Sequence, residues 1–204
     1  MKAAGGEKQD ADAAVYRDSA AEGEGRTDGM MKLYHTSDRE IRNPDIHHGR
    51  KNADFGWGFY LTPDRDFTRR WAGNNAVVNE YELDERGLLI HRFTRNQEWF
   101  QYIFQNRRLK DGLAVDVVLG PIANDTIFDT LGMISSGLLE PETAMRLLLI
   151  GPEYTQVVIK TEKAASQLRW TGAERISRIS SDEMEKEQKA YQEAFARELE
   201  RLIG

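Results

Sequence analysis

The chain has 204 residues, which is enough for one full hydrophobic core but, once the polar ends are set aside, too few for two ordinary domains. It contains no cysteine, which excludes disulfide scaffolds, thiolate catalysis and cysteine-ligated zinc. The net charge of -6 argues against a protein that holds nucleic acid by bulk electrostatics, because phosphate affinity comes mainly from clustered Lys and Arg.

The ends of the chain differ in composition from the middle. Residues 1–29 are rich in Gly, Ala, Asp, Glu and Lys, so we expect a disordered tail there, followed by one domain at 30–172 and a linker with a C-terminal helix at 173–204. No run approaches the ~18 apolar residues of a membrane span, and the N-terminus lacks the apolar stretch of a signal peptide. We therefore expect a soluble, cytoplasmic protein.

The first half of the domain begins with a predicted strand that contains Leu33, Tyr34 and His35. A long loop rich in Gly, Pro, Asn and Asp starts near Ile41 and leads into a second strand at 58–62. A short helix is predicted directly after it, with Thr62 as its cap and Pro63 in its first turn.

The remaining elements mix strands and helices without regular alternation, which favours an α+β core over a doubly wound sheet. Further strands are predicted at 77–83, 88–93, 115–121 and 154–161, and further helices at 96–106, 126–133, 141–149 and 162–168.

The C-terminal residues 181–203 predict a charged amphipathic helix. Its apolar residues form one narrow stripe: Met184, Tyr191, Phe195, Leu199 and Leu202. Such a stripe packs against a partner surface, which is either the domain itself or another protein.

Two features are candidates for chemistry: His35 with Thr36 on a strand, and the glycine-flanked aromatic segment 54–62. Gly56 and Gly58 let backbone approach a ligand, and neighbouring rings provide a stacking face for a planar heterocycle. A strand-borne His can bond a ribose hydroxyl. The alternatives are a structural histidine and a bulged strand that feeds the core.

Other polar clusters indicate less. His47 and His48 are adjacent, but no third ligand has suitable spacing, so we predict no metal site. The basic groups around Arg69 and around Arg107 are interpreted as solvated faces: Arg65, Arg69, Arg70, Arg107, Arg108 and Lys110.

Several segments together resemble an uncharacterised bacterial family of the ADP-ribosyltransferase superfamily. They are Leu-Tyr-His-Thr-Ser at 33–37, Asn-Pro-Asp-Ile at 43–46 with Gly-Arg at 49–50, and Asp-Phe-Gly-Trp-Gly-Phe-Tyr-Leu-Thr at 54–62. The similarity continues through 115–125 and 155–161, with Ala164, Leu168 and Trp170, and covers about residues 31–172. One departure is Thr36, where the family usually has Gly, so a backbone contact with nicotinamide is altered there.

The resemblance implies a split, partly antiparallel β core with flanking helices that cradles NAD as the substrate. Three catalytic positions are implied, in a His-Tyr-Gln signature: His35 bonds a ribose hydroxyl, Tyr60 stacks on nicotinamide, and Gln156 stands where active transferases usually have Glu. A neutral amide cannot offset positive charge on the ribose as a carboxylate does.

Further NAD contacts are implied around these positions. Arg50 is a candidate for the pyrophosphate, with a surface ion pair as its alternative. Asp125 or Asp54 supplies the missing anion, or else caps a helix or turn. The full predicted set of cofactor-binding residues is His35, Thr36, Arg50, Asp54, Phe55, Gly56, Gly58, Tyr60, Thr62 and Asp125.

The first functional hypothesis is an NAD-dependent mono-ADP-ribosyltransferase that modifies a protein or nucleic-acid acceptor. Relatives in the superfamily act as toxins, effectors or defence proteins. If this protein is an effector, the resemblance implies delivery to another cell. If it is a toxin, the resemblance implies that an antitoxin or another protein binds the 181–203 helix. The second is an NAD or ADP-ribose binding module without turnover, acting through a protein partner. A third, RNA processing like that of tRNA 2'-phosphotransferases, is disfavoured by the acidic charge.

Overall fold

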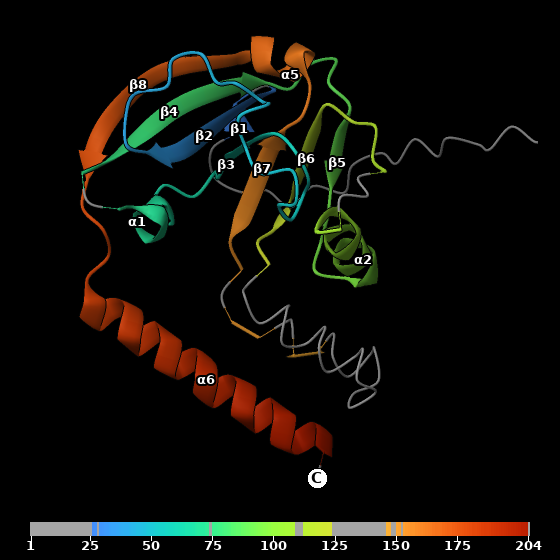
Figure 1. Cartoon of the computed structure of the whole chain (residues 1–204), viewed down its shortest axis with the longest axis vertical. Coiled ribbons are helices and arrows are strands. Elements are labelled where there is room, and N and C mark those ends of the chain that lie inside the picture. The colour runs from blue at the N-terminus through green and yellow to red at the C-terminus, as the bar shows by residue number, and fades with distance from the viewer. Residues whose placement is uncertain are drawn as a thin grey trace, which may run out of the picture.

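The computed structural model describes residues 26–27, 29–73, 75–108, 112–123, 146–147, 150–151 and 153–203. In these residues eight strands form two four-stranded sheets with helices beside them, so the predicted α+β class is confirmed (Figure 1). Among the described helices, none is both long enough and apolar enough to pass through a bilayer.

The first sheet has the strand order β1-β2-β4-β8, and all of its neighbouring strands are antiparallel. β2 pairs with β4 along its whole length, which places His35 opposite Asn79. The strands of this sheet are β1 (Arg26–Thr27), β2 (Met30–Ser37), β4 (Ala76–Asp84) and β8 (Leu168–Ile176).

The second sheet has the strand order β3-β7-β6-β5. β7 pairs antiparallel with both β3 and β6, whereas β5 runs parallel to β6 at the edge. Its strands are β3 (Phe59–Leu61), β7 (Thr155–Ile159), β6 (Val117–Pro121) and β5 (Ile90–Arg92).

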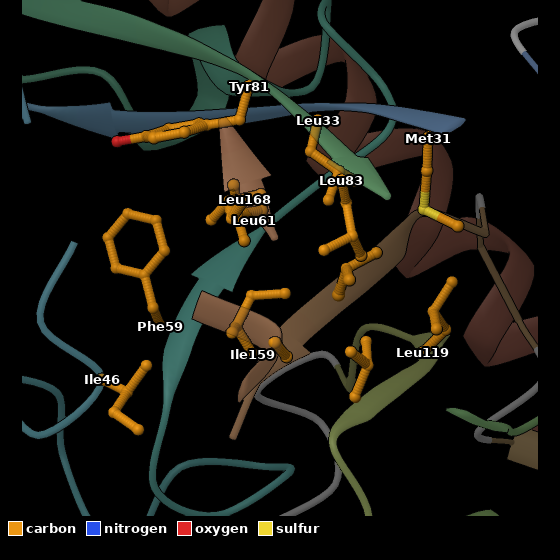
Figure 2. Packing of buried hydrophobic residues seen from close by; sticks show 13 residues of the cluster. Met31, Leu33, Ile46, Phe59, Leu61, Tyr81, Leu83, Leu119, Ile159 and Leu168 are labelled. Carbon is orange, nitrogen blue, oxygen red and sulfur yellow. The ribbon is translucent and has the colours of Figure 1, made fainter. Parts of the chain in front are cut away.

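The main hydrophobic core lies between the two sheets (Figure 2). Because side chains alternate along a strand, Leu33 and Leu83 of the first sheet face Leu61 and Ile159 of the second. The buried members of this cluster are Met31, Leu33, Ile46, Phe59, Leu61, Tyr81, Leu83, Val117, Leu119, Val157, Ile159, Ala164 and Leu168.

The other face of the second sheet is also covered, which explains why residues 117–119 of β6 and 157–159 of β7 are apolar on both faces. Val118 and Val158 point away from the main core and pack with residues of α2 (Gln97–Asn106). Asn96 caps this helix, since its side chain accepts a hydrogen bond of 2.9 Å from the backbone N–H of Trp99. Trp99 and Ile103 are the buried anchors of the helix.

One antiparallel bridge joins the two sheets. The backbone N–H of Tyr34 in β2 donates to the carbonyl of Thr62 at 2.8 Å, and the N–H of Thr62 donates back to Tyr34 at 2.9 Å. The hydroxyl of Thr62 also donates to the carbonyl of Thr155, at 2.8 Å. The end of β3 is therefore held to both β2 and β7.

The C-terminal helix α6 (Ser181–Ile203) confirms the predicted helix. A capping box precedes it: the Glu183 carboxylate accepts from the backbone N–H and the hydroxyl of Ser180, and the Ser180 hydroxyl accepts from the N–H of Glu183. Figure 1 shows α6 beyond the end of β8 and apart from both sheets. Arg70 forms an ion pair with Glu187 of this helix, with 2.6 Å between Arg70 Nη2 and Glu187 Oε1.

The sequence missed β8, which falls where a helix end and a linker were predicted. The helix α5 (Glu162–Ser166) is shorter than expected, and Leu168 already begins the strand. β8 is an edge strand with mostly partly exposed or exposed residues, and the register shifts opposite Glu80 and Tyr81, so its apolar residues do not alternate cleanly.

Two other expectations differ from the structure, and a third lies outside the residues that it describes. Thr62 does not cap a helix, because α1 (Thr68–Trp71) starts later, after a turn in which the Asp64 carboxylate accepts from the backbone N–H groups of Asp66 and Phe67. Residues 26–27, at the end of the expected tail, form β1. The predicted helix at 126–133, and most of the one at 141–149, lie outside the described residues.

Gly58 is required by the packing of β3 against β7. A Cβ atom at this position would lie 2.5 Å from the carbonyl oxygen of Ile159 and 2.6 Å from Val158 Cγ1. We predict that Gly58→Ala lowers the free energy of unfolding by about 2 kcal/mol or more, measured by urea denaturation. Gly73→Ala is the control, since its Cβ would meet nothing within 4 Å, and an equal loss in both variants would contradict this account.

Candidate functional site

A pocket of about 570 Å³ lies where β2, β3 and β7 come together, a size typical of small-molecule sites. Side chains from loops and helices complete its walls. The lining residues are His35, Thr36, Arg50, Asn52, Ala53, Asp54, Tyr60, Trp71, Arg107, Ile122, Ala123 and Gln156.

His35 is fixed by the neighbouring strand. Its Nδ1 lies 2.7 Å from the carbonyl oxygen of Tyr60, and because a carbonyl only accepts, Nδ1 carries the proton. Burial lowers the pKa of His35 below its ordinary value of 6.5, and the bond to Tyr60 opposes this shift in part. At neutral pH the ring is therefore uncharged, and Nε2 is a hydrogen-bond acceptor.

Tyr60 is held at both ends of its side chain. Its backbone carbonyl accepts from His35, while its hydroxyl donates to the Gly56 carbonyl at 2.7 Å and accepts from the Phe55 N–H at 3.0 Å. The ring lines the pocket in a fixed orientation. A planar group that enters the pocket meets a pre-organised aromatic wall.

Gln156 contributes a side-chain amide whose nitrogen has no hydrogen-bond partner among the described residues. The residue lies in β7 opposite Gly120 of β6 and is only 4% exposed. A buried polar group without a partner is costly, and because Gln156 lines the pocket, its amide is a donor there that no described residue uses.

Arg50 reaches the pocket from a loop that Trp57 holds in place. The Trp57 indole N–H donates to the His47 carbonyl at 3.0 Å, and the Lys51 ammonium lies 4.3 Å from the Trp57 ring centroid. Gly49 packs directly on Gly58, since a Cβ there would lie 2.8 Å from the Gly58 carbonyl oxygen. Arg50 itself is exposed and forms no ion pair with any described residue.

Asp54 is paired with Arg107, so neither side chain is a solvated surface charge. The Arg107 Nε and Nη2 atoms lie 2.8 and 2.5 Å from Asp54 Oδ1, and the two side chains are 13% and 14% exposed. The interpretation of Arg107 as part of a solvated basic face is therefore wrong. Asp54 lines the pocket as half of an ion pair and does not cap a turn.

The predicted catalytic and cofactor-binding residues separate into two groups. The pocket brings together His35, Thr36, Arg50, Asp54, Tyr60 and Gln156. Phe55, Gly56, Gly58 and Thr62 lie outside its lining: Phe55 is buried in the core under α2, and the others support backbone turns and strand packing. Asp125 is outside the described residues.

Sequence reasoning missed several lining residues. Trp71 falls in the short helix predicted after the 58–62 strand and was not a candidate site residue, but it lines the pocket with 41% of its surface exposed. Asn52, Ala53, Ile122 and Ala123 carry no local signal, because only the fold brings their loops to the same place.

His47 and His48 do not belong to this pocket. His47 packs edge-on against Trp57, with ring centroids 5.0 Å apart, and its Nδ1 lies 3.5 Å from Asp45. In the described part of the chain, no group of three or more His, Cys, Asp and Glu side chains could hold a metal ion.

The chain belongs to a family described as "Protein of unknown function (DUF3990)", whose model matches residues 31–170. The matched residues include every strand of both sheets except β1, although the first residue of β2 and the end of β8 fall outside the match. No curated protein and no solved structure matches the chain significantly.

The protonation of His35 is directly measurable. We predict that it titrates below pH 6.5 in a proton NMR titration of the folded protein, with His35→Asn assigning the signal. Because its pKa falls on folding, neutral His35 contributes stability that is complete above pH 6.5 and is lost as the pH falls through the folded-state pKa. A pKa above 6.5 would contradict the burial of this ring.

The Asp54–Arg107 pair predicts strong coupling between two substitutions. Asp54→Ala removes the Asp54 carboxylate from a largely buried ion pair and is expected to cost about 3 kcal/mol of unfolding free energy. The double variant Asp54→Ala with Arg107→Ala should lose clearly less than the sum of the two single losses in chemical denaturation. Additive losses would show that the pair is not formed in solution.

Proposed function

We propose that this pocket binds NAD⁺ and that the protein is a mono-ADP-ribosyltransferase. The observation that carries the proposal is the meeting of His35, Tyr60 and Gln156, from three different strands, around one pocket. These are the three positions for which the sequence resemblance implied contact with NAD⁺. The segments that separate them are long, so their convergence is independent support for that resemblance.

The polar groups suit the nicotinamide riboside half of NAD⁺. His35 Nε2 accepts a hydrogen bond from a ribose hydroxyl, and the Tyr60 ring stacks on the nicotinamide. The Gln156 amide donates to an oxygen of the ribose, which satisfies its unpartnered Nε2.

The exposed Arg50 guanidinium suits the pyrophosphate. Its planar fork presents several N–H donors to phosphate oxygens, and no described carboxylate competes for it. The net charge of -6 makes such a local cation more important, because the protein as a whole does not attract anions.

The proposed reaction breaks the bond between ribose C1' and the nicotinamide nitrogen. The bonding electron pair goes to that nitrogen, which neutralises the pyridinium, and positive charge develops on the ribose. A nucleophilic atom of a protein or nucleic-acid acceptor then bonds to C1' and loses a proton to solvent. Hydrogen bonds from the ribose hydroxyl to His35 hold the sugar in position for this attack.

A second candidate function is an NAD or ADP-ribose binding module, and Gln156 favours it. The amide is neutral and cannot stabilise the developing positive charge as a carboxylate would. The pocket would then hold its ligand without turnover. In this case the protein acts through a partner, for which the apolar stripe of α6 is the candidate surface.

The biological setting proposed for the transferase is that of a bacterial toxin, effector or defence protein. In the toxin case, the same α6 stripe, which includes Phe195 and Leu199, is the proposed site for a neutralising protein. This stripe is distinct from the pocket lining.

The test is incubation of the full chain with NAD⁺ labelled in its adenosine half, alone and with cell lysate. Nicotinamide release and label transfer are measured for the wild type and for His35→Ala, Tyr60→Ala, Gln156→Ala and Gln156→Glu. We expect release or transfer that falls at least about tenfold in the His35 and Tyr60 variants, because each loses a group that positions the substrate. Gln156→Glu should raise the rate, because it supplies the carboxylate.

Leu89→Ala is the matched control, since Leu89 is 64% exposed and lies outside the pocket. NAD⁺ binding without release in the wild type would replace the transferase by the binding module. Absence of NAD⁺ binding would overturn both functions.

A further inference from the structure

Trp71 is unusual because it is both large and exposed inside a pocket. Of the large apolar side chains that the structure describes as exposed, Trp71, Leu89 and Met184, Trp71 lines the pocket. Its 41% exposure contrasts with Trp99, which is 1% exposed in the core. An accessible indole at a pocket wall is available for contact with a ligand.

The indole is held by a series of aromatic contacts. Trp71 packs edge-to-face on Phe67, with ring centroids 4.7 Å apart, and Phe67 stacks on Tyr154 at 4.1 Å. Arg70 donates a hydrogen bond of 2.6 Å to the Tyr154 hydroxyl. These contacts fix the position of Trp71 before any ligand arrives.

The short helix that carries Trp71 is also fastened to the strand that carries His35. The Thr36 hydroxyl donates to the Thr68 carbonyl at 3.1 Å, so α1 is anchored one residue after His35. This position is where the resembling family usually has Gly, which has no hydroxyl to make the bond. Thr36 thus acts as a positioning residue for the Trp71 wall.

The two aromatic walls of the pocket differ in enclosure. Tyr60 is half-buried, with its hydroxyl engaged by backbone groups, and the neighbouring Gln156 is almost fully buried. Trp71 is exposed, at 41% of its surface. The enclosed wall suits a small ring that is held tightly, and the open wall suits a larger base whose polar edge stays hydrated.

We propose that Trp71 stacks on the purine base of the dinucleotide, at the open end of the pocket, while Tyr60 contacts the nicotinamide end. This inference rests on the proposed function and specifies the ligand as a molecule with two planar groups. Stacking of one base on one aromatic side chain corresponds to about 5- to 150-fold in affinity. Trp71 is therefore a specificity residue for adenine-containing ligands.

The test is isothermal titration calorimetry of the full chain with NAD⁺, ADP-ribose and nicotinamide mononucleotide. Trp71→Ala should weaken the first two by at least about fivefold and leave the mononucleotide, which has no adenine, within about twofold. Trp71→Phe keeps a ring and should retain most of the affinity. Leu89→Ala controls for the loss of an exposed apolar side chain, and thermal unfolding checks that each variant is folded.

The outcomes separate this proposal from the proposed function. If the wild type binds NAD⁺ but Trp71→Ala binds all three compounds as well as the wild type, the Trp71 assignment is wrong and the NAD⁺ pocket stands. Equal weakening of the mononucleotide and ADP-ribose would also overturn it, because Trp71 would then act on the whole pocket. No binding of any compound to the wild type would overturn both proposals.

Discussion

The structure depends on the short backbone bridge between Tyr34 and Thr62, where the two sheets meet. Each sheet could bury its apolar face against the other without this contact, but the bridge sets which residues stand side by side at the junction. It places His35 next to Tyr60, whose carbonyl holds the imidazole, while the Thr62 hydroxyl reaches the carbonyl next to Gln156. The pocket is thus a consequence of how two sheets are joined.

The junction also sets the chemistry that is available. The carbonyl of Tyr60 fixes the tautomer of His35, and burial keeps the ring neutral, so one acceptor faces the pocket. The Gln156 amide supplies a donor that the described protein does not use. A buried donor without a partner costs stability, and under the proposed function a bound ribose would supply the missing acceptor.

The sequence predicted the elements whose side chains alternate or run apolar over several residues, such as β4 and β7, because burial on one or both faces leaves a visible pattern. It missed β8, whose bulge and exposed edge remove the alternation. Within the site, the strand-borne His35 and Tyr60 were predictable from their motifs. The place of Trp71 in the pocket lining and the Asp54–Arg107 pair were not, because both depend on segments distant in the chain. Gly58 was also misinterpreted at the level of sequence. We predicted that it lets the backbone approach a ligand, whereas in the structure it allows β3 to pack closely against β7.

The most direct test of the account is an NMR titration of the ¹⁵N-labelled protein with NAD⁺ that follows the side-chain amide of Gln156, assigned with Gln156→Ala. The account predicts that this signal shifts on saturation together with the backbone amides of His35 and Tyr60, because all three lie at the same junction. Signals of α6 should stay unchanged. A titration in which NAD⁺ shifts other regions and leaves the Gln156 amide unmoved would contradict the central claim.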